Sequence, residues 1–292
     1  MPIDIIVATY GRHALLKEAL QSVADQTYPE WRCWISEDGK SIEMAEAIKP
    51  FLRDQRFIHL TGPHAGFPSA PRNRAIRHGR APLIAILDDD DIWLPDKLKH
   101  QVSFLERHPK CVALGCNAFV WNGTGSWEKA PLYFKKNRMG RISYDRLLEQ
   151  NYLINSSLVM RRDALLRSGP YNEHLDPPIG EDYELYMRLG AFGEIWSLPE
   201  PEMVYRQTAS TYYTKLNRRS NYRVKANLYE SALRGVVNMA SPLSFPENTH
   251  LAQACRRERD FYRRGPRILG RFRHDITHLF QRLWSGRAVR RS

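Results

Sequence analysis

Short apolar runs alternate with segments of helical periodicity through the first third of the chain, and this alternation most constrains the fold. Residues 3–8 form a nearly continuous apolar run, as expected of a strand buried on both faces of a parallel sheet. Apolar residues from Leu15 to Val23 then recur at helical spacing. Further strands are expected over residues 31–35, 56–60 and 83–87, with a helix over 45–52. Such alternation produces βαβ units, so the sequence predicts an α/β fold.

The rest of the chain is less regular, but its periodicity still predicts elements. A helix is expected over residues 95–105, a strand over 111–120, mixed structure over 142–167, a helix over 183–189 and a strand around 203–206. Hydrophobic residues make up 42% of the 292 residues, which is typical of a folded globular chain. Cys33, Cys111, Cys116 and Cys255 have neither the C-x-x-C spacing nor a nearby His that would indicate a zinc site, so we expect reduced, buried thiols.

Four consecutive aspartates, residues 88–91, follow the apolar run 83–87 directly. Carboxylates packed this closely repel one another, so a nearby cation is needed, and a divalent metal is the simplest choice. In an extended chain residues i and i+2 point the same way, so Asp88 and Asp90 are expected to face one site while Asp89 and Asp91 turn elsewhere. Mg²⁺ and Mn²⁺ prefer oxygen ligands and commonly use one or two carboxylates plus substrate phosphates. The alternative is a solvated acidic turn that caps the next helix.

Several segments, in order and spacing, resemble the inverting family 2 glycosyltransferases, which have the GT-A fold. Residues 86–98 resemble the family's Asp-x-Asp segment, and residues 180–188 its Glu-Asp motif. The segment Pro71-Arg72-Asn73-Arg74-Ala75 is similar to its Ala-Arg-Asn-x-Gly region, although Pro71 and Ala75 depart from that pattern. Further similar segments are 7–12, 36–41 and 204–206, so the resemblance covers roughly residues 1–215. It implies a GT-A-like, Rossmann-type mixed sheet flanked by helices.

The resemblance also implies roles for individual residues. Thr9, Tyr10 and Asp38 would hold the nucleotide, with the tyrosine ring offering a stacking face and the carboxylate accepting hydrogen bonds. Arg72 would clamp the diphosphate with its planar fork of donors. Each has an ordinary structural alternative: strand-end turn chemistry for the first three, and a solvated helix-face arginine for Arg72.

On the metal side, Asp90 would be the main ligand of Mn²⁺ or Mg²⁺, with Asp88 contacting the ribose or sugar and a metal-bound water. Asp182 would be the base that accepts the proton of the acceptor hydroxyl, with Glu181 as the second choice. Asp182 could instead only cap the helix that follows it. Arg206 would either reach a phosphate or line the sheet.

These inferences predict two regions, a GT-A glycosyltransferase domain over residues 1–215 and a helical, Arg-rich extension over 216–292. The expected reaction moves a sugar from a nucleoside-diphosphate sugar, by default a UDP-sugar, to an acceptor hydroxyl in surface-glycan or lipid-linked saccharide synthesis. A haloacid-dehalogenase-type phosphatase or phosphotransferase also places Asp-x-Asp at a strand end, although three strands precede the cluster here. A nucleic-acid-binding protein is the non-enzymatic alternative, but no recognisable binding module supports it, and no nucleic-acid partner is expected.

The C-terminal end holds most of the positive charge. Residues 256–292 contain twelve arginines and three acidic residues, a net charge of +9 out of +12 for the chain. An apolar stripe, which predicts a helix lying in an anionic membrane surface, runs along the same segment; its members are Phe272, Ile276, Leu279, Phe280 and Leu283, with Trp284 beside them. The alternative is that the stripe packs on the catalytic domain. With no signal segment or membrane span in the sequence, we expect a cytoplasmic protein, peripheral on the inner face of the membrane if the tail binds lipid.

Overall fold

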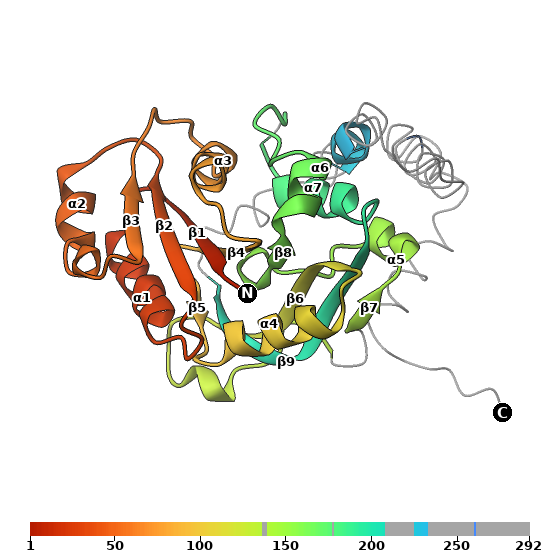
Figure 1. Ribbon diagram of the computed structural model, residues 1–292, viewed down its shortest axis with the longest axis horizontal. Coiled ribbons are helices and arrows are strands. Elements are labelled where there is room, and N and C mark those ends of the chain that lie inside the picture. Colours follow the sequence, from red (N-terminus) through yellow and green to blue (C-terminus); the bar gives the residue numbers. More distant parts are fainter. Residues whose placement is uncertain (136–138, 177, 208–224, 233–259, 261–292) are drawn as a thin grey trace.

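The computed structural model describes residues 1–135, 139–176, 178–207, 225–232 and 260. Within these ranges, nine strands form one mixed sheet of order β3-β2-β1-β4-β8-β6-β9-β5, with β7 paired to β9 (Figure 1). The strands are β1 (Ile3–Thr9), β2 (Trp31–Glu37), β3 (Phe57–Leu60), β4 (Leu83–Asp88), β5 (Ile92–Trp93), β6 (Cys111–Trp121), β7 (Gly140–Ile142), β8 (Val159–Arg161) and β9 (Glu194–Arg206). The α-helices are α1 (His13–Ala24), α2 (Ile42–Ile48), α3 (Ser69–His78), α4 (Lys97–Arg107), α5 (Tyr144–Glu149), α6 (Arg162–Ser168) and α7 (Glu181–Leu189).

The first four strands lie parallel, as the alternation of elements predicts. β1 pairs in parallel with both β2 and β4, and β2 pairs in parallel with β3. In this register Thr9 lies opposite Glu37, and Ala8 lies opposite Asp88. The carboxyl ends of β1, β2 and β4 therefore share one edge of the sheet, which is where ligands bind in open α/β folds.

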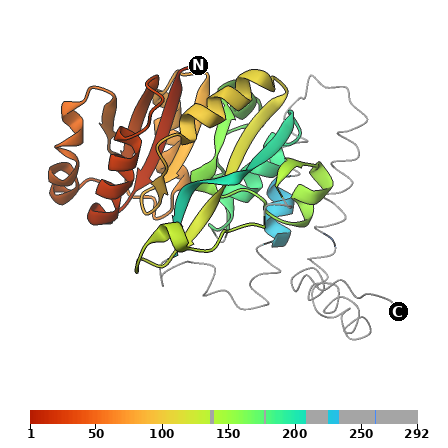
Figure 2. The same ribbon diagram turned by 90° about the horizontal axis from the view of Figure 1, so that it is seen from below.

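Helices cover both faces of the sheet. In β4, Leu83, Ala85 and Leu87 belong to the core cluster that includes side chains of α1, α2 and α4. Ile84 and Ile86 belong to the opposite cluster, which includes side chains of α3, α5, α6 and α7. Figures 1 and 2 show the same division, with α1 and α4 across one face and α3, α6 and α7 over the other. Each such aliphatic side chain contributes about 1.5–3 kcal/mol when fully buried, so the doubly buried strands fix the sheet.

Two elements differ from the sequence expectation, each for an identifiable reason. The helix expected over residues 45–52 is α2, which starts at Ile42 because the Ser41 hydroxyl accepts a hydrogen bond from the Met44 amide at 3.0 Å, an N-cap. The strand expected around residues 203–206 is β9, which starts at Glu194. Its sequence signal is interrupted by Pro199 and Pro201, which lie where the pairing with β6 shifts register.

A helical segment over residues 225–232 packs against the same core as α5 and α7. Leu228, Tyr229 and Ala232 are each 4% exposed or less and belong to that cluster. Figure 1 shows this segment, in cyan, beside α6 and α7. The predicted boundary between residues 215 and 216 falls outside the described residues.

The described cysteines, Cys33, Cys111 and Cys116, are free and buried, as expected. Burial raises the pKa of each thiol, to about 12 for Cys111 and Cys116. In the described part of the chain no helix has the length and apolar character to cross a membrane. The apolar stripe of residues 272–284 lies outside that part.

Candidate active site

An open pocket of about 580 Å³ lies at the carboxyl edge of β1, β2 and β4. Every residue that the sequence singled out for the site lies on its wall, which also includes residues from other positions. The predicted residues on the wall are Thr9, Tyr10, Asp38, Arg72, Asp88, Asp90, Glu181, Asp182 and Arg206. The others considered below are Arg12, Asp89, Asp91 and Asn155.

The four aspartates form a turn and do not continue as an extended strand. β4 ends at Asp88, and β5 begins only at Ile92, so the alternation expected along 88–91 does not extend past the first aspartate. The side chains of Asp88 and Asp90 are 30% and 19% exposed. Asp89 and Asp91 are 1% and 2% exposed. The turn thus presents Asp88 and Asp90 to the pocket and buries their neighbours.

Arg12, at the end of the β1 turn, neutralises part of this acidic turn. Its Nη2 lies 3.1 Å from Asp89 Oδ1, and its Nη1 donates to Asp90 Oδ2. Burial nevertheless raises the pKa of Asp89 to about 6, although the nearby guanidinium opposes the shift. Burial likewise raises the pKa of Asp90. The cation that the sequence requires beside the aspartates is therefore supplied in part by an arginine of the chain itself.

Arg206 holds the turn from the opposite side. Antiparallel pairing of β5 with β9 brings it there, and its amide donates to Asp91 Oδ1 at 2.8 Å. Its Nε donates to the Asp90 carbonyl at 2.9 Å, and its Nη2 donates to Glu18 at 2.6 Å. Burial raises the pKa of Asp91 well above its usual range, and the charges of Asp90 and Asp88 add to the shift.

Arg72, in the first turn of α3, links the two acidic parts of the pocket. Its Nη2 donates to Asp88 Oδ1 at 2.6 Å, and its Nη1 donates to Glu181 Oε1 at 2.7 Å. Among the described residues its Nε has no hydrogen-bond partner, although the side chain is only 5% exposed. The predicted clamp residue thus joins the end of β4 to the start of α7, and one of its donors remains unused.

Asp182 lies one residue after Glu181, in the first turn of α7, and stays partly exposed to the pocket. The N-cap position belongs to Gly180, whose φ of 76° is left-handed, and Asp182 accepts a hydrogen bond from the Tyr183 amide at 2.7 Å. Burial, reinforced by the charge of Glu181, raises the pKa of Asp182 to about 7. A carboxylate with that pKa suits proton transfer near neutral pH.

The side of the pocket near β1 and β2 presents an aromatic ring. Tyr10 is 60% exposed and stacks on His64, with ring centroids 4.4 Å apart. Asp38 accepts hydrogen bonds from the amides of Ala65 and Gly66 at 2.7 and 2.9 Å. The carboxylate therefore fixes the loop behind this ring. Thr9 is buried at 3% exposure, and its hydroxyl lies beside Asp89, where it opposes the rise in the pKa of that carboxyl.

Asn155 is a site residue that the sequence analysis missed. Its Nδ2 donates to Asp88 Oδ1 and Oδ2 at 2.9 and 3.1 Å. Its Oδ1 accepts from the hydroxyls of Tyr171 and Tyr186, each at 3.2 Å. No sequence signal marks it, because Asn155 begins a short 3₁₀ turn between α5 and β8 and reaches Asp88 only in the folded chain. Arg12 could have been found, since it ends the 7–12 segment that resembles the family's first turn.

The charge balance of the pocket leaves room for a divalent cation. Seven carboxylates line it, against the three arginines Arg12, Arg72 and Arg206. In the described ranges no group of three or more His, Cys, Asp and Glu residues is placed to hold a metal ion. Two partly exposed carboxylates, Asp88 and Asp90, offer the hard oxygen ligands that Mg²⁺ and Mn²⁺ prefer. These residues fit a metal whose remaining ligands come from phosphates and water.

Comparisons with known proteins identify the family and the fold. Residues 4–168, more than half of the chain, match the family described as "Glycosyl transferase family 2". A relative from Escherichia coli, named UDP-Glc:alpha-D-GlcNAc-diphosphoundecaprenol beta-1,3-glucosyltransferase WfgD, is 31% identical over 103 residues, which are 35% of this chain and 40% of that protein. The chain spans between 40% and 59% of the length of this relative and three uncharacterized mycobacterial ones.

Two solved structures have a similar fold. TarS 1–349 of S. aureus, in complex with UDP-GlcNAc, superposes with a TM-score of 0.70 at 17% identity, over 92% of this chain and 76% of that one. The mannosyltransferase PcManGT of Pyrobaculum calidifontis, in complex with GDP-Man and Mn²⁺, gives a TM-score of 0.59 at 15% identity, over 88% of this chain and 73% of that one. The predicted GT-A-like mixed sheet flanked by helices is confirmed.

Proposed function

This chain belongs to glycosyl transferase family 2, and from that membership we propose that it transfers a sugar from a nucleoside-diphosphate sugar to an acceptor hydroxyl, with inversion at the anomeric carbon. The observation that carries the proposal is the meeting of two acidic groups in one pocket. The partly exposed Asp88 and Asp90 lie at the end of β4 and in the turn after it, and Asp182, whose pKa is raised to about 7, lies in the first turn of α7 on the same wall.

On the donor side, Asp90 and Asp88 would hold Mn²⁺ or Mg²⁺ together with the donor diphosphate. When bound, the metal would neutralise the charge that develops on the departing nucleoside diphosphate. Arg72, with its unused Nε donor, would contact the diphosphate, and Arg206 would keep the acidic turn in place. The exposed ring of Tyr10 would stack on the nucleobase, next to the loop that Asp38 fixes.

On the acceptor side, Asp182 would accept the proton of the attacking hydroxyl. The hydroxyl oxygen forms a bond to the anomeric carbon while the bond from that carbon to the diphosphate oxygen breaks, so one displacement inverts the configuration. Arg72 Nη1 donates to Glu181 Oε1 at 2.7 Å, so this carboxylate oxygen is already engaged in an ion pair inside the pocket. The pairing therefore favours Asp182 over Glu181 as the base.

The substrate classes are proposed from the relatives. The name of the E. coli relative specifies a UDP-glucose donor and a diphosphoundecaprenol-linked acceptor, and TarS is bound to UDP-GlcNAc. A UDP-sugar donor and a saccharide or lipid-linked acceptor are therefore the first choice for this chain. PcManGT is bound to GDP-Man with Mn²⁺, which makes a GDP-sugar the next donor to test and supports Mn²⁺ as the metal.

The two alternative functions are less well supported. A haloacid-dehalogenase-type phosphatase carries its Asp-x-Asp near the start of the fold, whereas the cluster here follows β4, and the chain matches another family. A nucleic-acid-binding role has no motif in its favour. Steeply salt-dependent binding of RNA or DNA would revive it.

Incubation with a panel of nucleotide sugars and lipid-linked acceptors, with and without Mn²⁺, tests the proposal. We expect metal-dependent transfer from one donor and a product of inverted anomeric configuration. A retained configuration would rule out the single displacement. Release of phosphate from simple phosphoesters without sugar transfer would favour the phosphatase.

A further inference from the structure

We propose that Arg12 changes partners during donor binding: it pairs with Asp89 and Asp90 before the donor enters, and it moves onto the donor diphosphate when a divalent cation binds at Asp90. This inference rests on the proposed function. It assigns Arg12 a change of partners that the other two pocket arginines do not make, since Arg72 would contact the diphosphate from a fixed position and Arg206 would keep the acidic turn in place.

The contacts of the three pocket arginines set Arg12 apart. The side chain of Arg72 is 5% exposed and bridges two acidic groups, and that of Arg206 is 10% exposed and bonded to Glu18 and to the Asp90 carbonyl. The Arg12 side chain is 49% exposed, and both of its partners belong to the acidic turn. A side chain half in solvent can change rotamer at low cost, whereas the two buried ones would each abandon several bonds.

The backbone beside Arg12 also allows movement. Gly11 has a φ of +67°, and a Cβ placed on it would meet nothing within 4 Å. Arg12 itself takes the N-cap position of α1 without a side-chain capping bond, so its side chain is not needed to start the helix. The guanidinium is thus attached at an uncrowded turn at the pocket edge.

If Arg12 moves away, another positive charge must take its place beside Asp89 and Asp90. Asp89 is 1% exposed, and the guanidinium of Arg12 near its Oδ1 is its main charge compensation among the described residues, with the Thr9 hydroxyl as a weaker partner. A divalent cation bound at Asp90 would supply that compensation. It would also need Asp90 Oδ2, the oxygen to which Arg12 donates, so the cation and the guanidinium compete for one atom.

The donor supplies the new partner for the released guanidinium. Diphosphate oxygens accept the parallel N–H donors of arginine in a bidentate manner, and such charge-assisted bonds are about twice as strong as neutral ones. Competition at Asp90 followed by pairing with the diphosphate would make metal and donor bind together. Arg12 would then weaken the binding of metal alone and strengthen the binding of metal with donor.

Two binding measurements on the full-length protein test this exchange without relying on turnover. Free Mn²⁺, followed by electron paramagnetic resonance, gives the affinity for the metal alone, and calorimetry with Mn²⁺ plus UDP or GDP gives the affinity for the nucleotide. Arg12→Ala should bind Mn²⁺ alone about tenfold more tightly, as expected when one partly screened competing charge is removed. The same variant should bind the nucleotide that the wild type accepts about tenfold more weakly, because a bidentate contact is lost.

Arg77→Ala is the matched control, since Arg77 lies on α3, is 65% exposed and does not line the pocket. It should change neither affinity, and Arg12→Lys, which keeps the charge without the fork, should fall between Arg12→Ala and wild type. Suppose that the wild type binds Mn²⁺ and nucleotide together, but a folded Arg12→Ala variant binds Mn²⁺ alone no more tightly than the wild type. That result would overturn the exchange and leave the proposed function standing. A wild type that bound neither UDP nor GDP with Mn²⁺ would overturn both this inference and the proposed function.

Discussion

At the scale of one residue, Asp91 is a buried carboxyl group of the site that lowers the stability of the folded protein. It is 2% exposed, and burial together with the charges of Asp90 and Asp88 raises its pKa well above the usual range. Folded protein therefore retains a proton on Asp91 at pH values where the unfolded chain, with a pKa of about 3.9, has lost it. The free energy of unfolding therefore decreases as pH rises from about 4 through the folded-state pKa, because ionising this buried group destabilises the folded protein.

Asp91→Asn should consequently stabilise the metal-free protein, and increasingly so at higher pH. The amide keeps an oxygen for the Arg206 amide and offers a donor to Ser156. Because the pKa of Asp91 is raised well above its usual range only in the folded protein, we expect a gain at pH 8 that disappears below pH 4. Thermal denaturation across pH measures it, with Asp163→Asn, exposed at 71%, as the control. A gain that is the same at every pH would contradict the electrostatic cause.

If Asp182 is the catalytic base, kcat should depend on its ionisation. Only its ionised form can accept a proton, so kcat should rise with pH through a midpoint near 7, or below it once a bound cation stabilises the carboxylate. Asp182→Asn should lower kcat by about 10²–10⁴-fold and abolish this rise, while donor affinity stays near the wild-type value. A variant that keeps the acidic limb of the profile would show that another group is the base.

The sequence could predict the acidic residues of the pocket because each follows a strand or starts a helix at a recognisable spacing. Asp88 and Asp182 belong to motifs that can be read locally. The cation beside Asp89 and the amide beside Asp88 come from distant parts of the chain, since Arg12 and Asn155 meet the turn only through tertiary packing. Local spacing also does not show that the chain turns at Asp89, or that Arg72 is paired with Asp88 and Glu181.

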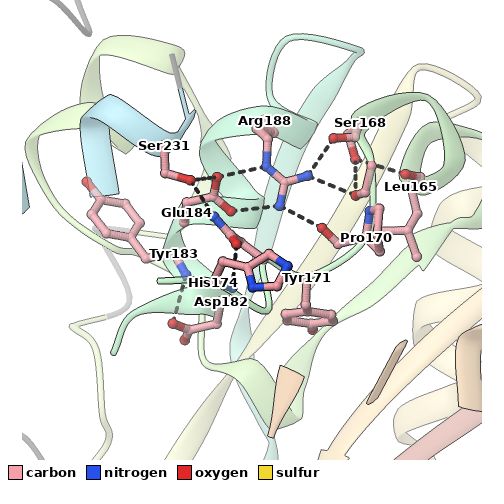
Figure 3. A network of polar contacts seen from close by, with 12 residues as sticks. Leu165, Ser168, Pro170, Tyr171, His174, Asp182, Tyr183, Glu184, Arg188 and Ser231 are labelled. Atoms are coloured by element: carbon pink, nitrogen blue, oxygen red, sulfur yellow. Dashed lines mark hydrogen bonds and ion pairs between the residues drawn. The ribbon is translucent and has the colours of Figure 1, made fainter. Parts of the chain in front are cut away.

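At the scale of elements, the start of α7 depends on a buried polar network (Figure 3). Arg188 pairs with Glu184 at 2.7 Å and donates to the carbonyls of Ser168, Gly169 and Pro170, which lead into the loop before Asp182. Ser231, from the 225–232 segment, donates to the same glutamate at 2.8 Å. The Arg188–Glu184 ion pair thus joins α7 to residues 168–170 and to the 225–232 segment. Because Asp182 lies in the first turn of α7, we expect its position to depend on this pair.

Arg188→Ala should therefore be strongly destabilising. Both partners of the pair are 4% exposed or less, and removing the cation leaves Glu184 buried and uncompensated, which typically costs about 3–5 kcal/mol. Urea unfolding measures the loss. Arg167→Ala is the control, because its pair with Asp163 is exposed and should contribute less than about 1 kcal/mol. Equal losses for the two variants would show that the network is not what stabilises α7.

The sequence predicts best those elements that are determined by nearby residues. The parallel strands β1, β2 and β4 could be read from continuous apolar runs, because both of their faces are buried. β9 could be read only in part, since its two prolines hide a strand that long-range pairing with β6 maintains. The place of β8 between β4 and β6 follows from packing and has no local signal.

At the scale of the whole molecule, the Arg-rich tail remains a prediction, because residues 261–292 lie outside the described ranges. Full-length protein should sediment with phosphatidylglycerol vesicles at low salt and be released at high salt, since each basic residue near an anionic surface contributes about 1 kcal/mol. A chain that ends at Ala254 is the right comparison, because it keeps the 225–232 segment whose side chains lie in the core. It should stay in solution yet bind donor. Equal sedimentation of both chains would count against the anchor and favour a tail that packs on the catalytic domain.

In the proposed site Asp90 joins metal and donor in one pocket, and calorimetric titration of nucleotide sugars with and without Mn²⁺ tests this most directly. Wild-type protein should bind its donor only when Mn²⁺ or Mg²⁺ is present, because two carboxylates alone make a weak site that the diphosphate completes. Asp90→Ala should keep its fold and lose this metal-dependent binding. Donor binding by Asp90→Ala that remains as tight and as dependent on Mn²⁺ as in the wild type would contradict the account.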